Sequence, residues 1–200
     1  DTHDVILNML EECRKVGHED RALMFCSLSK VTFPGAGVAA MAASRRNIDY
    51  ILKNMFPMII SFDKLNQVRH IRFLKDMDGL AAHMEKHRAL LEPKFRAVLA
   101  ILDEGLSGCG SIARWTKPNG GYFLSLYTLG GCAKRTVQLC REAGVVLTDA
   151  GAAYPYGVDP QDSNIRIAPT FPPLDELETA SRLLCVCVRI ATLEKLLQRQ

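Results

Sequence analysis

Lys30 lies at the end of an apolar run, between two serines and a turn rich in glycine and proline. The stretch SLSKVTFPGAG, residues 27–37, brings the hydroxyl groups of Ser27 and Ser29 close to this amine in the sequence. A lysine amine does covalent chemistry when it is partly desolvated or held near other cations. The stretch therefore predicts either a nucleophilic lysine with hydroxyls suited to binding a phosphate, or a lysine that simply leaves a strand for solvent.

Arg166 is a second candidate, because it interrupts the apolar run NIRIA, residues 164–168. A charge inside an apolar strand is costly unless an anionic partner compensates it. The guanidinium fork matches a planar carboxylate through two parallel hydrogen bonds. The sequence thus predicts a carboxylate-binding arginine, with a surface ion pair to a nearby aspartate (Asp159, Asp162 or Asp175) as the alternative.

Helical and strand patterns alternate along the chain in the way that an α/β protein requires. The early elements predict an α/β layer with a mostly parallel sheet, and the later ones an antiparallel strand pair joined by the turn Pro118-Asn119-Gly120. The predicted helices are 2–17, 44–56, two within 64–105 broken near 76–79, 131–143 and 173–197. The predicted strands are 22–29, 37–43, 111–118, 121–129, 145–147 and 164–168.

The composition excludes several classes of protein. The chain has 200 residues, 48% of them apolar, and a formal net charge of +3, which is too small and too evenly spread to indicate a nucleic-acid partner. No apolar run approaches the roughly 18 residues of a membrane span. The seven cysteines form no metal-binding spacing and predict buried thiols in a reducing compartment, most simply the cytoplasm. His83 and His87 could ligate a metal, but the sequence supplies no third ligand nearby.

Four segments together resemble the fold-type-I pyridoxal-phosphate aminotransferases of the class I/II superfamily, in particular a bacterial branch of aspartate- or alanine-type enzymes. SLSKVTFPGAGVAA (27–40) is similar to the segment of that family that contains the Schiff-base lysine. PNGGYFLSL (118–126), GVVLTDAGAAYPYG (144–157) and NIRIAP (164–169) are similar to three segments of its small domain. They occur in the family's order, and the resemblance covers nearly the whole chain.

The resemblance implies a function for each candidate residue. Lys30 would form the Schiff base with pyridoxal 5'-phosphate and shuttle the proton, Ser27 would contact the cofactor phosphate, and Arg166 would bind the α-carboxylate of the substrate. The implied activity is transfer of an amino group between an amino acid and a 2-oxo acid, by a homodimer without nucleic-acid or membrane partners.

The chain departs from the family pattern in two ways. The family's phosphate-binding arginine follows the lysine by seven or eight residues, where this chain has Gly37. The family's D-x-x-Y segment and ring-stacking aromatic precede the lysine by more residues than the 29 present here. We therefore expect this chain to be the later part of a larger protein. Its fold would comprise the end of a large mixed-sheet cofactor domain (1–60), interdomain helices (61–105) and a smaller α+β C-terminal domain (106–200).

Two other functions remain open at this point. The chain could be the aminotransferase-like effector domain of a winged-helix transcription regulator, which an upstream helix-turn-helix segment would reveal. It could also be a purely structural piece with a silent lysine, which covalent labelling of Lys30 would exclude.

Overall fold

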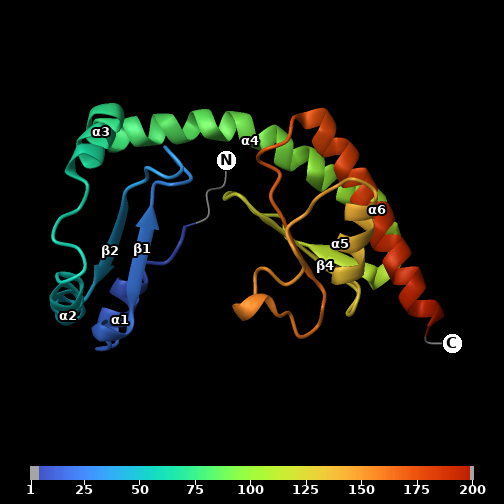
Figure 1. Ribbon diagram of the computed structural model, residues 1–200, viewed down its shortest axis with the longest axis horizontal. Helices are drawn as coiled ribbons and strands as arrows, with labels where there is room; N and C mark the ends of the chain where they lie inside the picture. Colours follow the sequence, from blue (N-terminus) through green and yellow to red (C-terminus); the bar gives the residue numbers. More distant parts are fainter. Residues whose placement is uncertain (1–4, 199–200) are drawn as a thin grey trace. The chain divides into compact units, whose positions relative to one another are not determined.

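The structure is a computed structural model that describes residues 5–198, and its contacts divide them into two compact units, residues 5–88 and 89–198 (Figure 1). The boundary falls inside one long helix, α4 (Met77–Leu106), which continues unbroken across Pro93. The sequence predicts a division into three parts, whereas the contacts divide the chain into two units. The three-part division stays a prediction.

The unit of residues 5–88 contains a strand pair and several helices. Its elements are α1 (Met9–Lys15), a 3-10 turn (Glu19–Arg21), β1 (Leu23–Ser27), β2 (Ala39–Ala43), α2 (Arg45–Met55), α3 (Lys64–Leu74) and the first part of α4.

The helix starts in this unit follow from side-chain caps. Ser44 caps α2 by accepting a hydrogen bond from the N–H of Asn47 (3.3 Å), and Asp63 caps α3 in the same way with Asn66 (2.9 Å). Such caps satisfy N–H groups that the helix itself leaves unpaired. The first helix is shorter than predicted, because Asn8 caps it and it begins at Met9. The predicted cap Thr2 lies outside the described residues.

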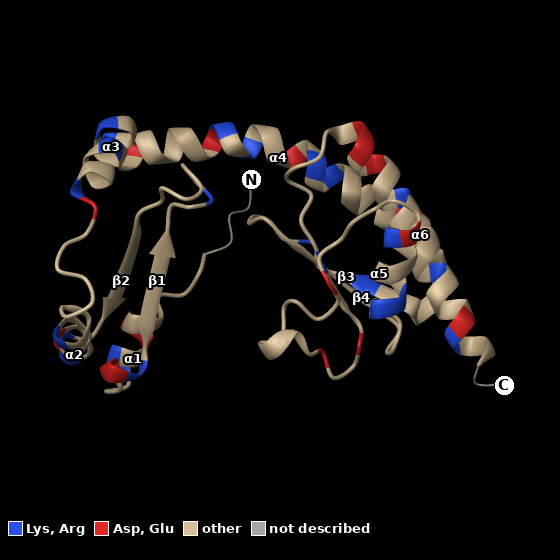
Figure 2. Ribbon diagram, in the orientation of Figure 1, with Lys and Arg blue, Asp and Glu red and all other residues tan. Residues whose placement is uncertain are grey.

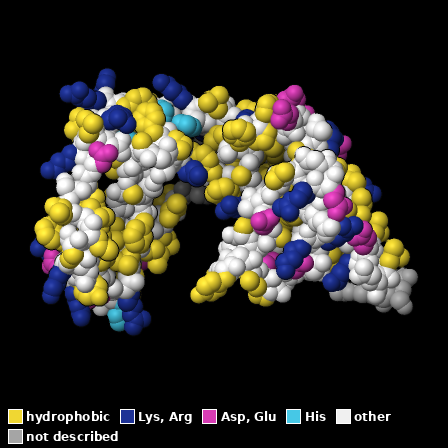
Figure 3. Space-filling model, in the orientation of Figure 1, with side chains coloured by type: hydrophobic (Ala, Val, Ile, Leu, Met, Phe, Trp, Pro, Cys, Tyr) yellow, Lys and Arg dark blue, Asp and Glu magenta, His cyan; other side chains and the backbone are white. Residues whose placement is uncertain are grey.

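Strands β1 and β2 are antiparallel, with Phe25 opposite Met41, and form a two-stranded sheet. The expectation of a mostly parallel sheet is wrong for residues 5–198, because each strand pairing described there is antiparallel. Two strands cannot bury both faces of a sheet, so Phe25 stays 72% exposed. Neither strand contains a charged residue (Figure 2), and yellow apolar side chains gather over this part of the surface in Figure 3.

The unit of residues 89–198 combines helices with a three-stranded antiparallel sheet in the order β3-β4-β5. The prediction of a strand at 145–147 is wrong, because this run has no regular secondary structure and pairs with no described strand. The elements after α4 are a 3-10 segment (Ser107–Ile112), β3 (Ala113–Trp115), β4 (Leu124–Thr128), α5 (Ala133–Glu142), a 3-10 turn (Pro155–Gly157), β5 (Asn164–Ile167) and α6 (Leu174–Leu197).

This second unit has a closed apolar core between the sheet and the helices. Leu102 of α4, Leu124 and Leu126 of β4, Ile165 of β5 and Val188 of α6 are each fully buried in it. Side chains alternate along β4 between buried and partly buried, as expected for a sheet with one face on the core.

Helices α4 and α6 approach closely where Gly105 faces Cys185. A Cβ atom added at Gly105 would lie 2.8 Å from the Cys185 sulfur, and that thiol donates to the carbonyl of Ile101 (3.7 Å). The missing side chain at Gly105 therefore permits the spacing of the two helices.

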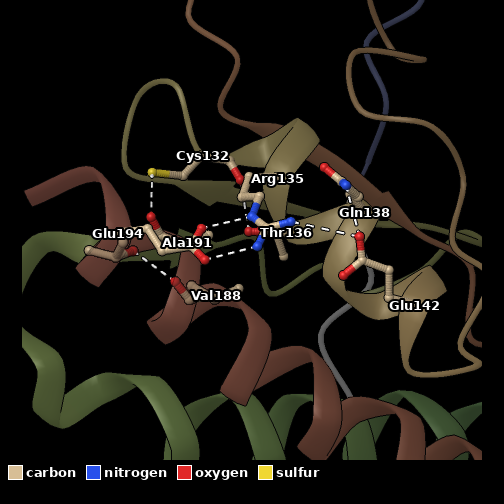
Figure 4. A network of polar contacts seen from close by, with 9 residues as sticks. Cys132, Arg135, Thr136, Gln138, Glu142, Val188, Ala191 and Glu194 are labelled. Carbon is tan, nitrogen blue, oxygen red and sulfur yellow. Dashed lines mark hydrogen bonds and ion pairs between the residues drawn. The ribbon is translucent and has the colours of Figure 1, made fainter. Parts of the chain in front are cut away.

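Helices α5 and α6 are joined by a group of polar contacts at the edge of this core (Figure 4). Arg135 of α5 donates two hydrogen bonds to the carboxylate of Glu194 on α6 (2.7 and 2.8 Å), and the Cys132 thiol donates to the carbonyl of Ala191 (3.7 Å). The hydrogen bond from Arg135 lowers the pKa of Glu194. This two-pronged contact fixes how α5 lies along α6.

Candidate active site

Lys30 lies in a tight turn directly after β1. The N–H groups of Val31 and Thr32 both donate to the carbonyl of Leu28 (2.9 and 2.8 Å), and the N–H of Leu28 extends the strand pairing by donating to Val38 (2.9 Å). Lys30 is thus placed at the exposed crest of the turn, on a backbone that both strands anchor.

The serines flanking this turn point their hydroxyls at each other. The Oγ atoms of Ser27 and Ser29 are 2.8 Å apart, and Ser27 Oγ also accepts from the N–H of Ser29 (3.1 Å). The two adjacent hydroxyls can donate to an anionic group such as a phosphate, and Lys30 follows them directly in the chain.

Gly37 lies against this cluster, on the other side of the loop. A Cβ atom at this position would be 2.5 Å from Ser29 Oγ and 3.0 Å from Ser29 Cα. A larger residue would have to displace the serine, so this loop conformation excludes an arginine at Gly37. This contact gives a steric reason why the chain has glycine at position 37, where the family has its phosphate-binding arginine.

Helix α3 contacts the same loop through two residues, Asn66 and His70, that the sequence analysis did not assign to the site. Asn66 donates to the carbonyl of Ala36 (2.7 Å), and His70 contacts the hydroxyl of Thr32 (2.8 Å). In the sequence, Asn66 and His70 are four residues apart and so lie on the same face of a helix. A search for apolar helix faces does not detect such a polar pair.

His83, the other candidate histidine of the sequence analysis, contacts the loop after Lys30. Its Nε2 atom lies 2.7 Å from the carbonyl of Val31 and 3.2 Å from Nε2 of His87. Residues 5–198 contain no group of three or more potential metal ligands.

Arg166 belongs to the unit of residues 89–198 and therefore to a different unit from Ser27 and Lys30. Its guanidinium carbon lies 4.7 Å from the ring centre of Phe123, and its Nε atom is buried without a hydrogen-bond partner among the described residues. An unpaired buried donor is costly, so the side chain is suited to an anion from outside the chain.

Two of the three aspartates proposed as alternative partners of Arg166 make other contacts. Asp159 accepts hydrogen bonds from the N–H groups of Gln161, Ser163 and Asn164 (2.8–2.9 Å), and Asp162 accepts from Lys134. Burial acts to raise the pKa of Asp159, but its hydrogen bonds to Ser163, Gln161 and Asn164 lower it overall. The carboxylate of Asp159 thereby fixes the loop that leads into β5 and Arg166.

The comparisons with known proteins point to one family of enzymes. The profile of the family described as aspartate amino-transferase matches residues 1–200. A relative from Mycolicibacterium smegmatis, named only at the level of an aminotransferase, is 49% identical over 181 residues, which are 90% of this chain and 42% of the relative.

Solved structures give the same result for the fold. An aspartate transaminase from Corynebacterium glutamicum is 40% identical with a TM-score of 0.89, over 94% of this chain and 44% of that one. LysN, an α-aminoadipate aminotransferase from Thermus thermophilus crystallised with N-(5'-phosphopyridoxyl)-L-leucine, has a TM-score of 0.77 at 20% identity, over 96% of this chain and 47% of that one, and supports the fold alone.

These matches confirm the mixed α/β fold and the expectation that it is the C-terminal portion of the aminotransferase fold. The chain spans about two fifths of the length of the curated relative. The individual roles of Ser27, Lys30 and Arg166 stay predictions.

Proposed function

Because the chain belongs to the aspartate amino-transferase family, we propose that the protein containing it transfers an amino group between an amino acid and a 2-oxo acid with pyridoxal 5'-phosphate as cofactor. The family match across residues 1–200 is the observation that carries this proposal. The position of Lys30 on an anchored, exposed turn supports it. The reported relatives are aminotransferases, which favours the enzyme over the effector domain of a winged-helix transcription regulator.

The residues near Lys30 fit the cofactor. The hydroxyls of Ser27 and Ser29 lie 2.8 Å apart, where they can bind a phosphate, and Gly37, which has no side chain, packs directly against Ser29. In this proposal backbone N–H groups of the loop replace the missing arginine as phosphate ligands. When bound, pyridoxal phosphate supplies the electron sink for the reaction, and the protein supplies orientation and charge.

Lys30 has two tasks in this proposal. Its amine is the point of covalent attachment of the cofactor, and it takes up and returns the proton at the substrate Cα atom. Its exposed position at the crest of the turn lets the amine reach the cofactor and then the substrate, but residues 5–198 do not supply the partial desolvation that activates such an amine.

Arg166 binds the α-carboxylate of the substrate. Its buried Nε donor lacks a partner among residues 5–198, and the two-pronged geometry of a guanidinium suits a carboxylate. Its stacking on Phe123 restricts the orientation of the guanidinium plane before the substrate arrives.

We further propose that the protein is a homodimer of the cytoplasm. The thiols of Cys13, Cys26, Cys109, Cys140, Cys185 and Cys187 are free, which suits a reducing compartment. The apolar residues that the unit 5–88 exposes, such as Phe25 and Phe56, suit burial against further protein. No described helix is both long and apolar enough to cross a membrane.

Replacement of Lys30 by alanine in the full-length protein tests the function. We expect Lys30→Ala to abolish transamination and to prevent borohydride from attaching the cofactor to this position, as read by peptide mass. Lys53→Ala on α2 is the matched control and should change neither. A Lys30→Ala variant with turnover within tenfold of wild type would contradict the proposal.

A further inference from the structure

Asn66 and His70 are the only buried residues among residues 5–88, with 8% and 4% of their surface exposed. Buried polar groups are costly unless they are hydrogen-bonded. Apolar residues of the same helix, Leu65 and Ile71, are 74% and 65% exposed. Helix α3 thus directs two polar side chains, and not its apolar ones, into the interior of this unit.

Both buried side chains contact the loop that follows Lys30. The amide nitrogen of Asn66 donates to the carbonyl of Ala36 (2.7 Å), and Nε2 of His70 lies 2.8 Å from the hydroxyl oxygen of Thr32. His83 on α4 adds a contact between its Nε2 and the carbonyl of Val31 (2.7 Å). The two residues directly after Lys30 are therefore held by two histidines from two different helices.

The hydrogen-bond partners determine which ring nitrogen carries the proton. Nδ1 of His70 faces the carbonyl of Asn66 (2.9 Å), and a carbonyl can only accept, so Nδ1 carries the hydrogen. Nε2 of His70 is then left as an acceptor for the Thr32 hydroxyl, whose single hydrogen is shared with the carbonyl of Leu28 (3.1 Å). By the same argument Nε2–H of His83 donates to the carbonyl of Val31.

We propose that Asn66, His70 and His83 are positioning residues for Lys30. This inference rests on the proposed function, in which Lys30 is the covalent lysine. By fixing the carbonyl of Val31, the hydroxyl of Thr32 and the carbonyl of Ala36, the three side chains hold the turn so that the amine points in one direction. A reactive group held in place before the reaction avoids an entropic cost during it.

Packing around the histidines supports a rigid arrangement. The ring of Phe33, in the same loop, lies edge-on to His70 with 5.8 Å between ring centres, and Phe73 lies edge-on to His83 at 5.1 Å. Each histidine ring is therefore held by an aromatic neighbour as well as by its hydrogen bonds. A ring held in this way can in turn hold the loop residue that it contacts.

The test compares variants of the full-length protein at His70 and Thr32. His70→Phe keeps a ring but loses both hydrogen bonds, whereas the side-chain oxygen of His70→Gln can still accept from Thr32. Thr32→Val removes the hydroxyl from the loop side, together with its hydrogen bond to the carbonyl of Leu28, and leaves the sequence of α3 unchanged. Leu65→Ala, on the exposed face of α3, is the control.

Hydrogen exchange of the cofactor-free protein is the first measurement. Loss of the hydrogen bond between His70 and Thr32, which both variants share, should make the amides of Val31 and Thr32 exchange about 3- to 10-fold faster in His70→Phe and Thr32→Val. His70→Gln and Leu65→Ala should exchange like wild type. In the loaded enzyme, kcat should fall about 10- to 100-fold in the first two variants, with the substrate KM within about twofold of wild type and with recovery in His70→Gln.

The outcomes separate this inference from the function on which it rests. If borohydride attaches the cofactor to Lys30 but exchange and kcat in Thr32→Val match wild type, the positioning role is wrong and the function stands. If kcat falls but His70→Gln does not recover, the contact with Thr32 is not the cause and the inference is equally wrong. If borohydride attaches nothing to Lys30 in wild type, the proposed function fails whatever the exchange rates are.

Discussion

The carboxylate of Asp159 offers a quantitative test of how the strand with Arg166 is held. Its Oδ2 atom accepts hydrogen bonds from the N–H groups of Ser163 and Asn164, both 2.8 Å long, and its Oδ1 atom accepts from Gln161 (2.9 Å). The side chain thereby ties the loop to the first residue of β5. We expect Asp159→Ala to destabilise the unit of residues 89–198.

The magnitude follows from the groups left without a partner. Ser163 and Asn164 are only 5% and 2% exposed, and each buried N–H that loses its acceptor costs about 1–3 kcal/mol. Asp159→Ala should therefore lower the free energy of unfolding by about 2–6 kcal/mol. Asp159→Asn keeps one oxygen and should lose about 1–2 kcal/mol, the difference between a charged and a neutral acceptor.

The effect should depend on pH in a defined direction. The folded-state pKa of Asp159 is lowered, because its hydrogen bonds outweigh the effect of burial. An aspartate whose pKa is lower in the folded state stabilises the protein at any pH above its unfolded-state pKa of about 3.9. This stabilisation disappears as the pH falls through the folded-state pKa. The stability difference between wild type and Asp159→Asn should thus be constant near neutral pH and shrink below about pH 4.

Urea unfolding of the 200-residue chain followed by tryptophan fluorescence measures these differences. Trp115 is the single tryptophan and lies in β3 of the same unit. Asp149→Ala is the control, because its ion pair with Arg141 is exposed and should contribute less than about 1 kcal/mol. Equal unfolding midpoints for Asp159→Ala and Asp149→Ala would refute the reasoning.

Three further predictions concern other parts of the chain. Arg166→Lys in the full-length protein should raise the substrate KM but leave cofactor affinity unchanged, since lysine loses the two-pronged geometry, worth about 1.5–3 kcal/mol; an unchanged KM argues against the assignment. Gly37→Ala should displace Ser29 and cost about 1–3 kcal/mol, while also weakening cofactor binding in a spectroscopic titration. Cys140 should resist a thiol reagent in the folded chain whereas exposed Cys26 reacts, because burial together with adjacent Cys187 raises the pKa of Cys140 to about 12.

Local signals predicted the helices and the second sheet well. The cap at Ser44, the turn at 118–120 and the long apolar pattern of α6 each depend on residues close together in the sequence, and the structure contains all three. The strand predictions were wrong where the structure of a segment depends on which other strand lies beside it. Residues 145–147 have strand-forming side chains, but no strand lies beside them, and β1 found an antiparallel partner where a parallel one was expected.

The candidate site was predictable only in part, for a related reason. Lys30 and Arg166 stand out as charges next to or inside apolar runs. The loop contacts of Asn66 and His70 join positions 30 and 38 residues apart, and no short-range pattern reveals such pairs. Leu65 and Val68 are three residues apart, the spacing of one apolar helix face, but the structure leaves both side chains exposed.

The close approach of Gly105 and Cys185 has a consequence for how this family can change over time. Because a Cβ atom at 105 would meet both Cys185 Sγ and Cβ, neither position can accept a larger residue while the other keeps its present one. Substitutions there are therefore coupled: alanine at 105 becomes acceptable only after position 185 has become smaller. Among homologous sequences the two positions should vary together, and this coupling would trace the contact between α4 and α6 in relatives of unknown structure.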